Sequence, residues 1–140
     1  MEDFGNVDNI VRGEPKHVEK SWGWELWFAN TARYCGKCLF VRWKEWSSKG
    51  AYHYHKIKDE TFFVVSGTLK LEYVTLDGEF KSMLLRENEA FRVDSQMKHR
   101  FTAATPEGCK FIEASTTHRD SDSYRVNWNE ESQKWIPVEQ

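Results

Sequence analysis

The stretch Gly50 to Gly67 reads GAYHYHKIKDETFFVVSG. It places His53 and His55 two residues apart, so on a β-strand both imidazoles leave the same face and can bind one metal ion. Glu60 follows five residues after His55, and Gly67 closes the segment at a predicted turn. The stretch therefore predicts a metal site that is built on β-strands.

A fourth ligand is expected from a later strand of the chain. His99, in the sequence KHRF, follows the predicted strand Ala90–Val93 and a turn. Asp59 competes with Glu60 for the carboxylate position, but the two have opposite parity along a strand, so only one can face inward. We select Glu60, which lies seven residues before Gly67. The expected ligand set is three imidazoles and one carboxylate.

These ligands predict one divalent metal ion as the cofactor. Three neutral imidazoles and one carboxylate leave such an ion with net positive charge, and an octahedral ion would keep two positions for water or substrate. The donor set suits manganese, iron, cobalt, nickel and zinc. The other two histidines, His17 and His118, lie in polar, charged surroundings and are expected on the surface.

The composition indicates a small soluble protein of one domain. The chain has 140 residues, with 20 Lys and Arg against 22 Asp and Glu. This charge balance includes no basic run, so nucleic acid is not an expected partner. No apolar stretch has the length that crosses a bilayer, and the acidic start MEDFGNVD is unlike a signal peptide. We expect a cytoplasmic protein without a membrane partner.

Three cysteines, Cys35, Cys38 and Cys109, are an odd number, which argues against a disulfide framework. Cys35 and Cys38 have the spacing of redox and zinc motifs, but no second pair completes a zinc site and no βαβ pattern surrounds them. We favour the interpretation that they are two small residues at the start of a strand.

Short apolar segments recur along the chain and predict an all-β sandwich or barrel. They alternate in polarity as strands do: Leu69, Leu71 and Tyr73 share one face. Asp77-Gly78 predicts a hairpin turn. The predicted strands are 39–43, 61–65, 69–74, 80–85, 90–93, 99–103 and 111–114. We expect an irregular N-terminal arm over 1–17, a barrel over 18–125 and an irregular C-terminal tail over 126–140.

The spacing of His53, His55, Glu60 and Gly67 resembles the first motif of the cupin superfamily. The stretch ENEAFRVDSQMKH, which ends at His99, resembles the second cupin motif in outline. The resemblance implies a double-stranded β-helix, the jelly-roll barrel of cupins, with the four ligands pointing into its mouth.

A narrower resemblance covers about residues 18–127. The segments VEKSWGWE and FIEAST look like the cupin domain of type II mannose-6-phosphate isomerases. This resemblance implies an aldose-ketose isomerase that acts on a sugar or sugar phosphate. In such a reaction a proton is removed beside a carbonyl, and a metal stabilises the enediolate. Lys20, Arg42 and Glu113 are the candidates for contact with the substrate.

Strand parity places other charged and aromatic residues away from the ligands. Lys56, Lys98 and Arg100 neighbour the ligand histidines in sequence and are expected to point outward. Tyr52 and Tyr54 flank His53 and have the opposite parity, so they are expected to pack away from the metal. Seven tryptophans, five of them near the first strands, are expected to fill the core or a homodimer interface.

Two other classes of function stay open. The first is a barrel that binds a sugar or small acid without turnover. The second is another metal-dependent cupin enzyme, a dioxygenase or a lyase that acts on dimethylsulfoniopropionate. In those lyases a catalytic tyrosine stands two residues after the glutamate, where this chain has Phe62, and this difference counts against the lyase.

Overall fold

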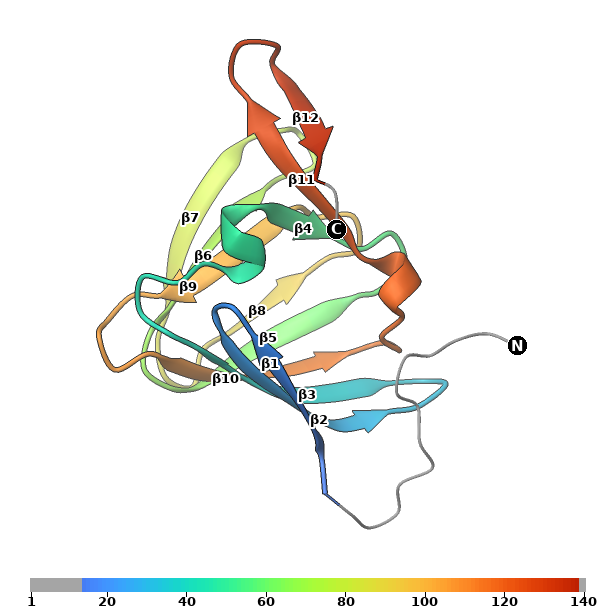
Figure 1. Cartoon of the computed structure of the whole chain (residues 1–140), viewed down its shortest axis with the longest axis vertical. Coiled ribbons are helices and arrows are strands. Elements are labelled where there is room, and N and C mark those ends of the chain that lie inside the picture. The colour runs from blue at the N-terminus through green and yellow to red at the C-terminus, as the bar shows by residue number, and fades with distance from the viewer. Residues whose placement is uncertain (1–13, 139–140) are drawn as a thin grey trace.

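The structure, a computed structural model, describes residues 14–138. Its strands form two antiparallel sheets of six strands each, which face each other across the core (Figure 1). The first sheet has the order β1 (Lys16–Lys20), β2 (Gly23–Asn30), β3 (Cys35–Val41), β10 (Cys109–Ser115), β5 (Glu60–Ser66), β8 (Ala90–Val93). The second has the order β12 (Lys134–Pro137), β11 (Tyr124–Asn129), β4 (Tyr52–Tyr54), β9 (His99–Ala103), β6 (Leu69–Val74), β7 (Phe80–Leu85).

Alternating side chains of both sheets make the core between them. On β5, Phe62 and Val64 are buried, whereas Phe63 and Val65 are exposed on the outer face. The period-two pattern of the strand therefore decides which side chains fill the sandwich. Phe62 packs edge to face against Phe101 and Phe111, with ring centroids 5.9 and 5.2 Å away. The all-β prediction is confirmed.

The seven strands predicted from apolar segments all correspond to observed strands. The turn at Asp77-Gly78 joins β6 to β7, but it belongs to a five-residue loop, residues 75–79, rather than to a two-residue turn. Thr75 N donates to Glu79 O across this loop, and Gly78 takes a positive φ of 90°. The sequence pattern therefore located the hairpin correctly and made its loop too short.

The expectation of an irregular C-terminal tail is wrong. Residues 124–137 contain β11 and β12, which extend the second sheet beside β4 (Figure 1). Polar residues interrupt this segment, but its aromatic residues lie on one face, which packs over Tyr52. The Trp135 ring lies 5.3 Å from the Tyr52 ring and stacks on the ring of Phe80. The arm predicted over 1–17 falls mostly outside the described residues, and its last two residues begin β1.

Gly67 ends β5 with a positive φ of 81°, a conformation that residues with a Cβ atom rarely adopt. A Cβ atom at this position would also collide with the carbonyl oxygen of Gly108. Gly67 thus allows the turn from β5 into β6 to pass close to the loop before β10. The predicted turn at this glycine is confirmed.

Cys35 and Cys38 lie at opposite faces of β3. Cys35 is buried and Cys38 is half-buried, and both are free thiols. Residues three apart on a strand point to opposite sides, so these two sulfurs do not face each other. Burial raises the pKa of the Cys35 thiol. The arrangement favours the interpretation of two small residues at the start of a strand.

Replacement of Trp135 by alanine tests whether the C-terminal hairpin is part of the folded unit. The half-buried indole contacts Tyr52 and Phe80, so we expect Trp135→Ala to lower the free energy of unfolding by about 2 kcal/mol. Ile136→Ala is the matched control, because that side chain is 44% exposed. Urea denaturation measures both, and equal small changes would show that the hairpin does not stabilise the barrel.

Candidate metal centre

His53, His55, Glu60 and His99 converge between the two sheets. Each offers one ligand atom, and these atoms all lie within 4.8 Å of one another. The Glu60 oxygen Oε2 lies 3.3 Å from Nε2 of His55 and 3.4 Å from Nε2 of His99. The structure thus brings together the four residues that the sequence selected as metal ligands.

The strand pairing explains this convergence. His53 on β4 is directly opposite His99 on β9, and their ring centroids are 4.0 Å apart. Glu60 begins β5 in the other sheet and points inward with Phe62 and Val64. Asp59 has the opposite parity, and its carboxylate accepts from Arg92 at the surface, at 2.8 and 3.1 Å.

Two backbone carbonyls orient the ligand imidazoles. Nδ1 of His55 donates to the carbonyl of Asp122 at 2.8 Å, and Nδ1 of His99 donates to that of Met97 at 2.9 Å. A carbonyl only accepts, so in the neutral imidazoles each Nε2 carries the lone pair. Both lone pairs face the Glu60 carboxylate, an arrangement that a cation between them would stabilise. Such outer contacts are typical of metal ligands.

Several buried atoms of the cluster have no hydrogen-bond partner among the described residues. They are Nδ1 of His53, Oε2 of Glu60 and Nε2 of His99. Buried polar atoms are rarely left unpaired, because an unmade hydrogen bond costs about 1–3 kcal/mol. A metal ion is the ligand that would satisfy this mixture of imidazole nitrogen and carboxylate oxygen. The donor set therefore fits one divalent ion.

The protonation states also suit metal binding. Burial, with the neighbouring imidazoles of His99 and His55, holds the pKa of His53 well below its usual range. Burial alone raises the pKa of Glu60, but the ammonium of Lys58 and the contacts with the two histidines outweigh it and hold that pKa well below its usual range. At neutral pH the cluster thus presents a neutral imidazole and a carboxylate.

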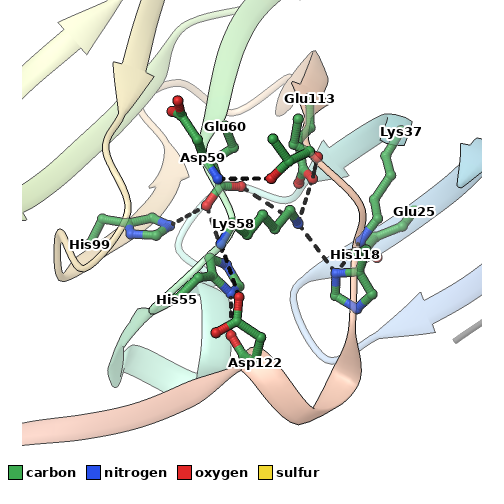
Figure 2. Close-up of polar contacts among 12 residues, drawn as sticks. Glu25, Lys37, His55, Lys58, Asp59, Glu60, His99, Glu113, His118 and Asp122 are labelled. Carbon is green, nitrogen blue, oxygen red and sulfur yellow. Dashed lines mark hydrogen bonds and ion pairs between the residues drawn. The ribbon is translucent and has the colours of Figure 1, made fainter. Parts of the chain in front are cut away.

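A cavity of about 370 Å³ opens beside the ligands, and Lys58 is one of the residues that line it. Its side chain extends from near Glu60 toward His118 (Figure 2). The Lys58 ammonium contacts Glu113 at 2.6 Å and Glu60 at 3.9 Å. Burial lowers the pKa of Lys58, but Glu113 and Glu60 outweigh this effect and raise it. Burial raises the pKa of Glu113, but the charges of Lys58 and Lys37 outweigh this effect, and the pKa of Glu113 is lowered. Lys58 and Glu113 therefore face the cavity as a cation and an anion.

A second set of polar groups continues the cavity wall away from the ligands. His118 Nδ1 lies 3.2 Å from Nζ of both Lys37 and Lys58. Lys37 lies 3.8 Å from the Glu25 carboxylate and above the ring of Trp27, whose indole N–H donates to Glu25 at 2.7 Å. The wall thus alternates hydrogen-bond donors and acceptors over two strands and one loop.

The structure separates the three candidates for substrate contact. Lys20 and Glu113 line the cavity. Arg42 is exposed and donates to the carbonyl of Ser21 at 3.3 Å, and it is not among the residues that line this cavity. It follows β3 directly, where the chain has left the sheet that forms the wall.

The residues expected to point away from the ligands do so. Lys56 lies over the ring of Tyr124, Lys98 over that of Tyr54, and Arg100 over that of Tyr52. Three cationic and three aromatic side chains therefore pack on the outer side of the second sheet. His17 is exposed, as predicted.

The expectation that His118 lies on the surface is wrong. Its side chain is buried, and it lines the cavity beside the Trp27 ring, at a centroid distance of 4.9 Å. A pair of hydrogen bonds with Asn30 holds its backbone: His118 N donates to Oδ1 at 2.9 Å, and Nδ2 donates to His118 O at 3.2 Å. No local pattern in the polar segment around His118 indicates this distant pairing.

Lys58 and Lys37 are cavity residues for which the sequence held a signal. Lys58 precedes Glu60 by two residues, and Lys37 precedes Leu39 by two. In each pair both members have the same parity and are buried. Once Glu60 and Leu39 are placed on the inner face, their parity would have indicated both lysines as inward-facing.

Comparison with known sequence families matches residues 41–115 to the Cupin domain family. The chain is a cupin. The match contains all four residues of the metal cluster, and the jelly-roll fold of two facing sheets agrees with it. A comparison with curated proteins gives no match.

Solved structures share the fold of this cupin at low sequence identity. The capsular polysaccharide assembling protein CapF of Staphylococcus aureus is 16% identical with a TM-score of 0.70, over 82% of this chain and 32% of that protein. Oxalate decarboxylase of Bacillus subtilis is 12% identical with a TM-score of 0.69, over 85% and 33%. The cupin thus spans about a third of these structures' length. These similarities confirm the jelly-roll barrel.

The described residues contain no helix that is long and apolar enough to cross a membrane. The helical segments within residues 14–138 are two short 3₁₀ turns, Ser47–Gly50 and Asp120–Asp122.

Loss of a ligand should remove the metal. We expect His53→Ala and His99→Ala to bind no stoichiometric divalent metal, because each leaves an incomplete donor set. His17→Ala is the control, since that histidine is exposed. Elemental analysis of the purified proteins measures the content. Metal should also raise the melting temperature of the wild type, because it binds only the folded state. Full metal occupancy in both variants would contradict the site.

Proposed function

We propose that this cupin binds one divalent metal ion and interconverts an aldose and a ketose, with a sugar or sugar phosphate as substrate. The observation that supports this most directly is the buried ion pair of Lys58 and Glu113, at 2.6 Å, on the wall of the cavity beside Glu60. It supplies an acid and a base next to the metal ligands, and these are the two groups that the reaction needs.

The chemistry follows from the charges of these two groups. A bound divalent ion would polarise the substrate carbonyl and offset the negative charge that develops on its oxygen. The Glu113 carboxylate takes the proton from C2 of the aldose, and Lys58 donates a proton to O1. Return of a proton to C1, with loss of the O2 proton, then gives the ketose. Both residues begin in the protonation state that their step requires, and proton transfer requires the substrate to separate them, because their ion pair raises the pKa of Lys58 and lowers that of Glu113.

The rest of the wall fits a polyhydroxyl substrate. Hydroxyl groups both donate and accept hydrogen bonds, and the cavity offers carboxylates at Glu25 and Glu113 with ammonium groups at Lys37 and Lys58. The indole of Trp22 also lines this cavity and provides an apolar surface for a sugar ring. This mixture suits several hydroxyl groups in one small molecule better than an apolar substrate.

The alternatives are less well supported by the site. A barrel that only binds its ligand has no need for a buried acid and base beside the metal, and such a pair is costly to bury. A lyase that requires a tyrosine at the position of Phe62 lacks that hydroxyl, and Phe62 is buried in the core. Another metal-dependent reaction, such as a dioxygenase reaction, stays an outcome that the experiment below can show.

The isomerase hypothesis is tested by turnover. The protein is loaded separately with manganese, cobalt, nickel and zinc and incubated with mannose 6-phosphate, fructose 6-phosphate and free pentoses. We expect aldose and ketose to interconvert for at least one sugar, which proton NMR follows directly. Saturable binding without conversion of any sugar would instead support the binding protein. Oxygen consumption would support the dioxygenase.

Glu113→Gln separates proton transfer from metal binding. The amide keeps the size of the side chain and a contact with Lys58, but it no longer accepts a proton. We expect kcat to fall roughly 100-fold or more, while metal content stays at the wild-type value. Glu72→Gln is the control, because that carboxylate binds Arg100 on the outer side of the sheet. Unchanged kcat in Glu113→Gln would exclude Glu113 as the base.

The homodimer and the cytoplasmic location stay predictions. A surface on which the dimer would form is an apolar row on the outer face of the first sheet, where Leu26, Cys38, Ile112 and Phe63 lie opposite one another on neighbouring strands. Light scattering should then give twice the chain mass of 16.6 kDa. The mass of a single chain at micromolar concentration would exclude the dimer.

A further inference from the structure

His118 occupies a position that the proposed reaction does not use directly. It comes from the segment after β10 and reaches the end of the charged wall where the side chains of Lys37 and Lys58 end (Figure 2). Its side chain is buried and contacts two ammonium groups. The group is not one of the four that converge as metal ligands.

The contacts of His118 define its tautomer. Nε2 lies 2.9 Å from the Asp120 carboxylate, which only accepts, so Nε2 carries the proton. In the neutral imidazole the lone pair is then on Nδ1, where Lys37 and Lys58 approach at 3.2 Å each. Burial and these two ammonium groups lower the pKa of His118 to about 4. The imidazole is therefore neutral at pH 7, and the one lone pair on Nδ1 is shared between the ammonium groups of the two lysines.

Two other residues, Asn30 and Trp27, hold His118 in place. The Asn30 side chain accepts a hydrogen bond from the backbone N–H of His118 and donates one to its carbonyl. The edge of the imidazole ring packs against Trp27 at a centroid distance of 4.9 Å. The ring therefore has little freedom to turn away. A fixed acceptor between two long lysine side chains reduces the rotamer entropy that each loses when it becomes ordered for catalysis.

We propose that His118 is a positioning residue, whose neutral imidazole holds the ammonium groups of Lys37 and Lys58 at the cavity wall. This inference rests on the proposed isomerase function, because that function makes Lys58 the acid. Without the Nδ1 acceptor, Lys58 keeps its carboxylate partners but loses one of the contacts that fix its direction. Lys37 keeps only Glu25, at 3.8 Å, and the Trp27 ring as partners among the contacts described above.

Two replacements of His118 distinguish positioning from general packing. The side-chain oxygen of His118→Asn can occupy the place of Nδ1 and accept from the lysines. The amide of His118→Gln reaches instead to the place of Nε2 and Asp120, so the lysines lose their acceptor. Both variants lose the ring that packs on Trp27, and a merely structural role would make them equally defective.

We expect His118→Gln to lose roughly 10- to 100-fold in kcat, the usual effect of losing a hydrogen bond to a charged group. The KM should rise as well, because Lys37 is displaced. His118→Asn should recover most of this kcat, and both variants should keep stoichiometric metal. His17→Gln, at an exposed histidine, is the control. Equal losses in the two His118 variants, or no loss in either, would overturn the proposal.

A second measurement keeps this test independent of turnover. Crystal structures of the two metal-loaded variants should show Lys58 Nζ near Glu113 in His118→Asn and displaced in His118→Gln. If the wild type converts no sugar but the lysines move as expected, the isomerase function fails and the positioning role stands. If sugars are converted and both lysines keep their places in His118→Gln, the positioning role fails alone.

Discussion

The ammonium group of Lys58 lies between two buried carboxylates, 2.6 Å from Glu113 and 3.9 Å from Glu60. Charged groups are costly to remove from water, and a buried pair is tolerated only when its geometry and hydrogen bonds compensate the loss. Glu60 connects this pair to the histidines, and His118 connects it to the second lysine. The arrangement of the whole cavity therefore depends on one cation that touches both the metal ligands and the base.

Among the charges that line the cavity, the buried ones do not balance one another, whereas Lys20, Asp120 and Arg125 lie nearer the surface. Three buried carboxylates, Glu25, Glu60 and Glu113, face two buried ammonium groups, Lys37 and Lys58, which leaves one negative charge. A divalent ion on neutral imidazoles would change this excess to one positive charge. Such an interior favours a ligand in which negative charge develops, as on the oxygens of an enediolate. The proposed reaction thus agrees with the electrostatics of the cavity as well as with its geometry.

Parity along strands, together with the spacing to Gly67 and the cupin-like motifs, predicted the metal cluster, and His53, Glu60 and His99 all belong to regular strands with buried neighbours. It was not sufficient for His118, which a hydrogen-bonded pair with Asn30 brings across the molecule. The C-terminal hairpin was missed for another reason: Trp128 and Trp135 stand among polar residues, and their apolar face exists only once Phe80 is beside them. Local patterns thus predict what one strand presents, whereas contacts between distant segments require the folded chain.

The contacts of Asp122 determine when, during folding, the chain can bind its metal. Its carboxylate accepts from the backbone N–H groups of residues 56–58, and its carbonyl accepts from His55. A nascent chain that has not yet delivered this residue lacks the acceptor that turns the His55 ring toward the other ligands. Metal capture should therefore come late in folding, after the segment that contains residue 122 has packed against residues 55–58. Hydrogen exchange at the amides of residues 56–58 would report when that step occurs.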